Sequence, residues 1–262
     1  MLRFTMSPES PSPGLSRLRD RARLLTDAEL AGVPWLGLLS PEDRDHALRD
    51  MRVATAAPGD LICRIGRPAT FWFGVIDGLL KMSNDASQGP MITFTGVPPG
   101  AWFGEGTLLK RESYRYNIEA LRTTRVAGLP MQTFHELLDR SIPFNRFVLN
   151  QLNERLGQFI AARETDRHND PDTRVARNLA ALFHPVLYPG VGEVLRITQQ
   201  ELGYLVGLSR QRVNEALKDL QGLGLIRIEY GGLRVLDLTG LRGYRPQPKR
   251  GKSEAAERLP PR

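Results

Sequence analysis

The sequence predicts an α+β protein in which an antiparallel β-module is followed by one long helix and a C-terminal domain of short helices with a β-hairpin. Three observations support this prediction. Residues 53–132 consist of short apolar runs separated by turn residues, whereas residues 144–169 carry apolar side chains at helical spacing. Residues 198–235 then give two short capped helices and two alternating strands. With 262 residues, the chain is long enough for more than one domain.

Turn residues define the β-module. They recur at Gly59, Gly66, Gly78, Gly89-Pro90, Pro98-Pro99-Gly100 and Gly104. This spacing is typical of a many-stranded antiparallel sandwich or barrel. Short helices are expected ahead of it over residues 25–51, where Ser40 is a typical N-cap and Pro41 a typical first helical residue.

The long helix carries an apolar seam. Leu149, Leu152, Leu156 and Phe159 are 3, 4 and 3 residues apart, which is a pattern that two facing helices use. The seam packs either against a second copy of the chain or against the chain's own β-module, and the spacing leaves both arrangements open. We expect the helix to end near residue 169, because Asp170-Pro171 supplies an N-cap and a first-position proline for the next helix.

Caps and turns mark a two-helix motif in the C-terminal domain. Thr198 and Glu201 have the spacing of a capping box. Gly207 permits a sharp turn, and Ser209 caps the helix that follows. Two short helices joined in this way form a helix-turn-helix, and the alternating strands around Gly231-Gly232 add a wing.

The second helix of this motif has a polar side that packing does not require. Its apolar residues fall within about 100° of one another around the helix axis; they are Val213, Ala216, Leu217 and Leu220. We predict that the opposite side lies in the major groove of DNA, where Arg210 matches a guanine edge. Glu215 either accepts from cytosine or pairs with Arg212 or Lys218. The predicted DNA contacts are Thr198, Gln199, Ser209, Arg210, Gln211, Asn214, Glu215 and Lys218.

Basic residues concentrate at the two ends of the chain. The formal charge is +7, of which residues 1–26 contribute +3 and residues 245–262 contribute +4. Both ends are rich in Ser, Pro and charged residues, and we expect them to be disordered tails. The charge is therefore weak support for nucleic-acid binding.

Several function classes find no support in the sequence. The single cysteine, Cys63, excludes an internal disulfide or an all-cysteine metal site within one chain. The four histidines are scattered without metal-ligand spacing, and no P-loop, nucleophile elbow or dinucleotide fingerprint occurs. We expect no enzymatic activity, no catalytic or metal site, no membrane segment and a cytoplasmic location.

The order of these elements, together with ITQQELGYLVGLSRQRV at 197–213, resembles the Crp/Fnr family of bacterial transcription regulators. The resemblance implies a homodimer that binds a pseudopalindromic operator in double-stranded DNA and contacts RNA polymerase, with Arg210, Gln211 and Glu215 at the base-reading positions. It implies the following division: a tail and short helix (1–33), a β-roll of the cyclic-nucleotide-binding type (34–143), a dimerisation helix (144–169), a winged helix-turn-helix (170–244) and a basic tail (245–262).

The effector site that the resemblance implies is divergent. AWFGEGTLLKRESYRYN at 101–117 looks like the family's phosphate-binding cassette, with matching residues at Gly104, Glu105 and Arg115. Tyr116 replaces the serine of the cassette, and Phe159 with Ile160 replaces the hydroxyl pair that touches the purine. A pocket that has lost the hydrogen-bond partners of its ligand discriminates far less strongly between that ligand and others.

Three readings of the effector site stay open. It binds a cyclic nucleotide, it binds another nucleotide such as a cyclic dinucleotide through the same arginine, or it has lost this role. In the last case Arg115 pairs with Glu105 or Glu119, and Tyr116 fills the pocket. The alternative for the whole chain is a ligand-binding regulatory module that acts through protein contacts without DNA binding.

Overall fold

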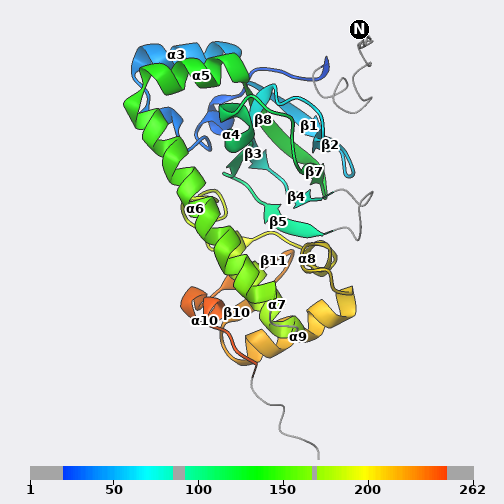
Figure 1. The fold of residues 1–262 in the computed structure, drawn as a ribbon. Helices are drawn as coiled ribbons and strands as arrows, with labels where there is room; N and C mark the ends of the chain where they lie inside the picture. Colours follow the sequence, from blue (N-terminus) through cyan, green and yellow to red (C-terminus); the bar gives the residue numbers. More distant parts are fainter. Residues whose placement is uncertain (1–19, 85–91, 167–169, 247–262) are drawn as a thin grey trace, which may run out of the picture.

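The computed structural model describes residues 20–84, 92–166 and 170–246. A β-roll packs along one side of a long helix, and a domain of short helices and a hairpin lies at the far end of that helix (Figure 1). The α+β architecture with a β-roll, a long helix and a winged helix-turn-helix is confirmed. The predicted tails lie largely outside the described residues.

The segment ahead of the β-roll forms short helices, as the sequence predicts. They are α2 (Asp27–Leu30), the 3-10 helix η1 (Leu36–Leu38) and α3 (Pro41–Asp50). The Ser40 hydroxyl caps α3 by accepting from the Asp43 amide at 3.2 Å. Residue Arg23 forms a bridge to Val53 of the first strand, which ties this segment to the roll.

The β-roll consists of two four-stranded antiparallel sheets. One sheet has the order β1 (Arg52–Ala56), β8 (Thr124–Pro130), β3 (Phe71–Asp77), β6 (Trp102–Phe103). The other has the order β2 (Leu61–Cys63), β7 (Asn117–Ala120), β4 (Leu80–Ser83), β5 (Thr93–Val97). Gly78, with φ 110°, turns the chain between β3 and β4, where a Cβ would meet the Thr124 backbone at 2.6 Å.

Aromatic side chains join the roll to the long helix. α4 (Glu105–Leu109) and α5 (Met131–Arg140) precede α6 (Ile142–Asp166). The Trp35 ring lies 5.4 Å from Trp72, 5.1 Å from Trp102 and 5.3 Å from Phe144 of α6, between ring centroids, and all four residues are fully buried. Rings at these distances attract one another beyond simple burial, so this cluster anchors the first turns of α6.

The seam predicted for the long helix divides between two sides of α6. Leu152 and Phe159 pack against the chain's own core, whereas Leu149 and Leu156 are 59% and 60% exposed. A helix advances 100° per residue, which places Leu149 and Leu156 on one line and turns the other two about 60–80° away. The prediction that these four residues form a single seam was therefore wrong. The exposed line instead includes Ile160, which is 57% exposed.

The C-terminal domain contains the predicted helix-turn-helix and wing. Its elements are α7 (Pro171–Leu182), β9 (Val194–Leu195), α8 (Gln199–Val206), α9 (Arg210–Gly222), β10 (Ile226–Glu229), β11 (Gly232–Val235) and α10 (Leu238–Arg242). The caps are confirmed: the Asp170 carboxylate accepts from the Thr173 amide, Thr198 and Glu201 form a capping box, and the Ser209 hydroxyl accepts from the Arg212 amide. Gly207 ends α8 in the left-handed conformation.

The turn of the wing lies one residue earlier than predicted. Glu229 pairs with Gly232, so the two-residue loop is Tyr230-Gly231, and Gly231 has φ 73°. Gly232 instead belongs to β11, where an added Cβ would lie 2.8 Å from the carbonyl oxygen of Leu195 in β9. The second glycine is thus required by close strand approach rather than by the turn.

The helix-turn-helix packs directly on the β-roll. An added Cβ at Gly96 of β5 would lie 2.7 Å from Leu205 of α8 and 2.9 Å from Leu182 of α7. The Thr93 hydroxyl donates to the carbonyl oxygen of Tyr204 at 3.1 Å. The buried residues of both parts form one continuous hydrophobic cluster. The two parts of the chain therefore share a core across β5.

An arginine at the β7–β8 turn reinforces this contact. Arg122 donates to both carboxylate oxygens of Glu201 at 3.3 Å, and to the carbonyl oxygens of Gly78 at 3.2 Å and Arg196 at 2.7 Å. Glu201 is buried and also closes the capping box of α8. The Arg122 side chain thus connects the β3–β4 turn of the roll to the start of the helix-turn-helix.

Replacing Gly96 by alanine should destabilise the contact between the β-roll and α8. The added methyl group overpacks against Leu205 and Leu182, so we expect Gly96→Ala to lower the free energy of unfolding by about 1–3 kcal/mol. Gly222→Ala is the matched control, because nothing lies within 4 Å of its added Cβ. Urea unfolding of both variants measures the difference, and equal stability of the two would contradict this contact.

Candidate nucleic-acid interface and ligand cavity

The polar side of α9 is exposed and continuous. Val213, Ala216, Leu217 and Leu220 are buried, as predicted, and hold the helix against its own domain. Arg210, Gln211, Glu215 and Lys218 are exposed. At 100° per residue these four side chains and Asn214 occupy an arc of about 140° on the other side of the helix. α9 is therefore a surface helix that offers donors and acceptors to a partner.

The predicted DNA contacts differ in whether the chain's own side chains already engage them. Asn214 is half-buried, and its amide oxygen accepts from Gln199 of α8 at 2.9 Å, so the two helices of the motif are joined by these amides. Gln211 donates to Glu215 at 3.3 Å. Arg210 and Lys218 form no ion pair within the described residues, which leaves both cations available to phosphates or bases.

Thr198 and Ser209 stand at the two helix starts as capping residues. Both are exposed, and their hydroxyls accept from the amides of Glu201 and Arg212, respectively. Arg212 lies 2.5 Å from the Asp172 carboxylate of α7 and 3.7 Å from that of Glu215. The predicted pairing of Arg212 with Glu215 is thus the longer of two contacts, and Arg212 chiefly fastens α9 to α7.

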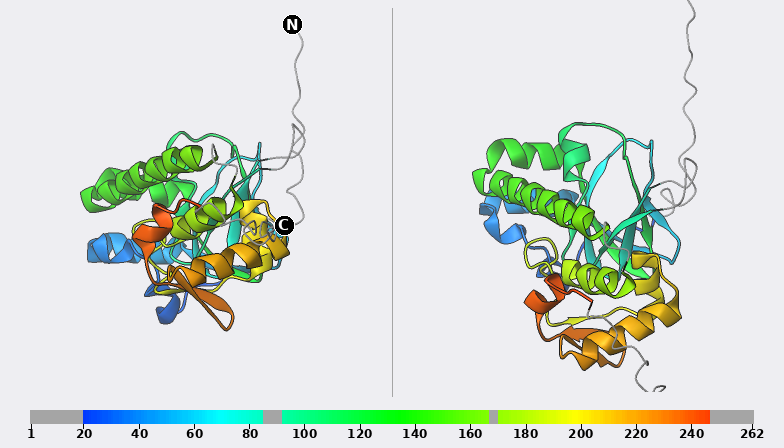
Figure 2. Two further views of the ribbon diagram at one scale, coloured as in Figure 1. Left: turned by 90° about the horizontal axis from the view of Figure 1, so that it is seen from below. Right: turned by 60° about the horizontal axis from the view of Figure 1, so that its bottom comes forward.

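The wing adds two surface residues that sequence reasoning did not single out. Tyr230 at the tip of the hairpin is fully exposed, and Arg227 of β10 is exposed as well. The β10–β11 hairpin lies beside α9 at the same end of the molecule (Figure 2). The exposure of Tyr230 could have been suspected from its place ahead of a glycine turn.

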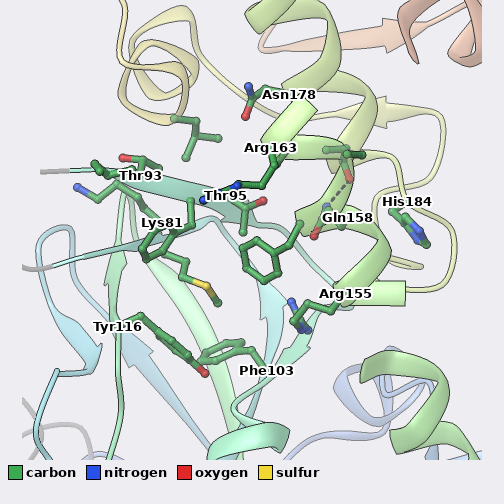
Figure 3. A pocket seen from close by; sticks show the side chains of 18 of the residues that line it. Lys81, Thr93, Thr95, Phe103, Tyr116, Arg155, Gln158, Arg163, Asn178 and His184 are labelled. Carbon is green, nitrogen blue, oxygen red and sulfur yellow. Dashed lines mark hydrogen bonds between the residues drawn. The ribbon is translucent and has the colours of Figure 1, made fainter. Parts of the chain in front are cut away.

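A cavity of 1570 Å³ lies between the β-roll, α6, α7 and α8 (Figure 3). It is cationic. From the roll come Lys81, Lys110 and Arg115; from α6 come Arg155 and Arg163; and from the C-terminal domain come Arg174, Arg177 and Arg242. Among the described lining residues the carboxylates are Glu105 and Glu112. Such an excess of positive charge in a hollow favours an anionic ligand.

The predicted cassette residues Gly104 and Glu105 begin the short helix α4. Gly104 has φ 97°, and no side chain caps the helix there. Glu105 is buried and accepts from Arg155 Nε at 2.9 Å. Burial opposes the charge of Arg155, but the adjacent Glu105 carboxylate raises its pKa overall. Sequence reasoning missed Arg155, although it lies one helical turn before Phe159 on the same side of α6.

This buried ion pair is incompletely satisfied. Arg155 also donates through Nη2 to the carbonyl oxygen of Trp102 at 2.8 Å. Its Nη1 and the Oε2 atom of Glu105 are buried without a hydrogen-bond partner among the described residues. A buried donor and a buried acceptor side by side are costly unless a ligand or water fills them. They are suited to a hydroxyl group, which donates and accepts at once.

The other three predicted effector residues are Arg115, Tyr116 and Phe159, and they differ in their contacts. Arg115 is exposed and pairs with Glu112 at 2.9 Å, while Lys81 pairs with Glu119 at 3.0 Å. The expectation that Arg115 pairs with Glu105 or Glu119 was therefore wrong, because Arg155 and Lys81 occupy those carboxylates. Tyr116 and Phe159 line the cavity, and burial raises the pKa of the Tyr116 phenol. Ile160 faces outward instead.

Other kinds of site are not found in the part of the chain that the structure describes. No group of three or more His, Cys, Asp or Glu residues is placed to hold a metal ion there. No described helix is long and apolar enough to cross a membrane. Cys63 is buried in β2, and burial raises the pKa of its thiol, which disfavours the reactive thiolate.

The chain matches the cyclic nucleotide-binding domain over residues 54–141 and the Crp-like helix-turn-helix domain over residues 173–244. The transcriptional regulator SdrP of Thermus thermophilus is 30% identical over 188 residues, which cover 70% of this chain and 89% of SdrP. The cAMP-activated global transcriptional regulator CRP of Haemophilus influenzae is 28% identical over 165 residues, covering 62% and 73%. FixK2 from Bradyrhizobium japonicum has a similar fold, with a TM-score of 0.59 at 17% identity, covering 73% of this chain and 95% of FixK2.

A β-roll of the cyclic-nucleotide-binding type joined to a Crp-like helix-turn-helix defines a DNA-binding transcription regulator. The chain belongs to the Crp/Fnr family. Proteins of this family bind DNA and work as dimers. The alternative of a regulatory module that does not bind DNA finds no support in these comparisons.

Replacing Arg210 by alanine should weaken sequence-specific DNA binding. Arg210 is exposed in the first turn of α9, so we expect Arg210→Ala to cost about 1–3 kcal/mol on a duplex selected from a random pool and to relax the preference at one base pair. Arg44→Ala, at an exposed site on α3, is the control. Fluorescence anisotropy measures both, and unchanged affinity would remove Arg210 from the reading surface.

Proposed function

We propose that the chain acts as a homodimer whose two α9 helices occupy successive half-sites of a pseudopalindromic operator, with its activity set by an anionic effector in the cavity. The observation that carries this proposal is the exposed polar arc of α9 above a fully buried apolar side. Arg210, Gln211 and Glu215 then meet base edges, while Thr198, Ser209 and Lys218 approach phosphates. The domain division expected from the sequence serves this function.

The exposed apolar line on α6 is the surface we propose for dimerisation. Ile142, Leu149, Leu156 and Ile160 are each more than half exposed. They fall within about 40° of one another around the helix axis. A line of this kind at spacings of 7, 7 and 4 residues is suited to a second α6. At about 1.5–3 kcal/mol for each side chain removed from water, eight side chains supply about 12–24 kcal/mol, enough to offset the cost of association.

We propose that the effector is a nucleotide whose sugar hydroxyl lies between Arg155 and Glu105. The support is the pair of buried atoms without partners, Arg155 Nη1 and Glu105 Oε2, beside the left-handed Gly104. Arg115 lines the cavity but is already paired with Glu112. Phe159 occupies the side where a hydroxyl would otherwise meet a purine, which disfavours cyclic AMP.

RNA polymerase is the protein partner we propose, and the cytoplasm is the compartment. Both follow from the family to which the chain belongs, since a regulator acts on promoters where the polymerase binds. The proposal fits a chain whose described helices include none that could cross a membrane.

Charging the exposed line of α6 should dissociate the dimer and remove its preference for symmetric sites. We expect sequences selected by the wild-type protein to be inverted repeats, and the Leu149→Glu/Leu156→Glu variant to sediment as a monomer that has lost this preference. Leu24→Glu/Leu38→Glu is the matched control, because both leucines are exposed and neither belongs to α6. A variant that remains dimeric would refute this interface, and asymmetric selected sites would refute the two-fold arrangement.

Cyclic AMP should bind weakly or not at all, because Phe159 offers the purine no hydrogen bond. We expect Phe159→Thr to gain cyclic-AMP affinity by about tenfold, roughly the value of one hydrogen bond. Phe159→Leu, which changes size without adding a hydroxyl, serves as the control. Isothermal titration calorimetry makes the comparison. Micromolar binding of cyclic AMP by the wild-type protein would contradict this account of the cavity.

A further inference from the structure

One amide on the polar side of α9 is held by a side chain from another helix. Asn214 lies between Arg210 and Lys218, four residues from each. At 100° per residue it is turned about 40° from both, so the three side chains form one row along α9. Arg210 and Lys218 are exposed, whereas Asn214 is half-buried and is joined to Gln199 of α8. The row therefore has a neutral amide, fixed from outside the helix, between two cations.

The bond between Gln199 and Asn214 crosses from α8 to α9. Gln199 Nε2 donates to Asn214 Oδ1 at 2.9 Å, and both residues are half-buried. The neighbouring bond from Gln211 to Glu215 is longer, 3.3 Å, and joins two exposed side chains of the same helix. That second pair can separate while α9 stays in place. The orientation of the Asn214 amide, in contrast, is set by the position of α8.

The residues at the two ends of this bond stand on well-anchored helices. Gln199 is the first residue of α8, and the Glu201 carboxylate that closes the capping box of that helix also accepts from Arg122 of the roll. On α9, Val213 next to Asn214 is buried in the core. The amide is thus oriented before DNA arrives, which reduces the side-chain entropy that binding must remove.

The atoms that Asn214 has left match one base better than the others. An asparagine amide has an oxygen with two lone pairs and two N–H donors. The bond from Gln199 uses one lone pair, so one acceptor site and both donors remain. An acceptor beside a donor matches the N6 amino group and the N7 atom of adenine in the major groove, whereas arginine and lysine offer donors only and match guanine.

We propose that Gln199 positions Asn214 to read an adenine in each half-site of the operator, so that sequence preference depends on the contact between α8 and α9 as well as on α9 itself. This inference rests on the proposed function, in which α9 lies in the major groove. Asn214 makes the contact with the base. Gln199 is a positioning residue, and it acts on the base through Asn214.

Parallel selection of operators from a random duplex pool tests the inference with the full-length wild-type protein and the Asn214→Ala variant. We expect wild-type sites to carry an A·T pair, in both half-sites, at a position where the Asn214→Ala sites show no preference. Fluorescence anisotropy on four duplexes that differ only at this position then measures the preference. It should be about tenfold for the wild-type protein, the value of one bidentate contact.

Gln199→Met removes the donor and keeps the length of the side chain. It should reduce the preference for A·T to about twofold or less, because the Asn214 amide is no longer oriented. Gln200→Met is the matched control: Gln200 is the next residue of α8, is exposed and makes no side-chain hydrogen bond within the described residues. It should keep the full preference. In the Asn214→Ala background, Gln199→Met should not change the ratio of affinities further, because no amide is left to position.

Three results would overturn the inference. They are an Asn214→Ala variant that selects the same base pairs as the wild-type protein, a Gln199→Met variant with the full preference for A·T, and an equal loss of affinity for all four duplexes in Gln199→Met. The last result would mean that Gln199 contacts the DNA backbone instead. In each case the wild-type protein still selects a specific operator. A wild-type protein that selects no operator overturns the proposed function instead.

Discussion

The packing of α8 against β5 is the contact on which the rest of the structure depends. Gly96 leaves room for Leu205 and Leu182, and Arg122 joins the β-roll to Glu201 at the start of α8. Because Glu201 also caps α8, the same carboxylate serves the helix and the domain contact. The cavity is closed on one side by this packing, so its shape and the position of the reading helix are set together.

The long helix α6 serves two surfaces at once. Leu152, Arg155 and Phe159 face the β-roll and the cavity, while Leu149 and Leu156 face solvent. The proposed effector cavity and the surface proposed to meet the second subunit therefore lie on two sides of the same helix. Under the proposed function, effector binding and dimerisation would both act on α6.

The sequence predicted the order of elements well because its signals are local. Capping residues such as Ser40, Thr198 and Ser209 act within one helical turn, and the buried side of α9 follows from helical periodicity. The division of the α6 seam and the partner of Glu105 could not be predicted, because both depend on which side of a helix meets a distant sheet. Arg155 pairs with Glu105, 50 residues away in the sequence, and Arg122 pairs with Glu201, 79 residues away. No local sequence pattern marks either arginine. The wing turn lies one residue earlier than predicted because Gly232 is needed for close packing against β9, a strand more than thirty residues away in the sequence.

The central claim is that the β-roll and the helix-turn-helix share one core across β5. Differential scanning calorimetry of the dimeric protein tests it most directly. The account predicts a single cooperative transition in which the β-roll and the C-terminal domain unfold together, with a calorimetric enthalpy matching the van't Hoff enthalpy for a dissociating dimer. Two resolved transitions, each belonging to one part of the chain, would contradict it.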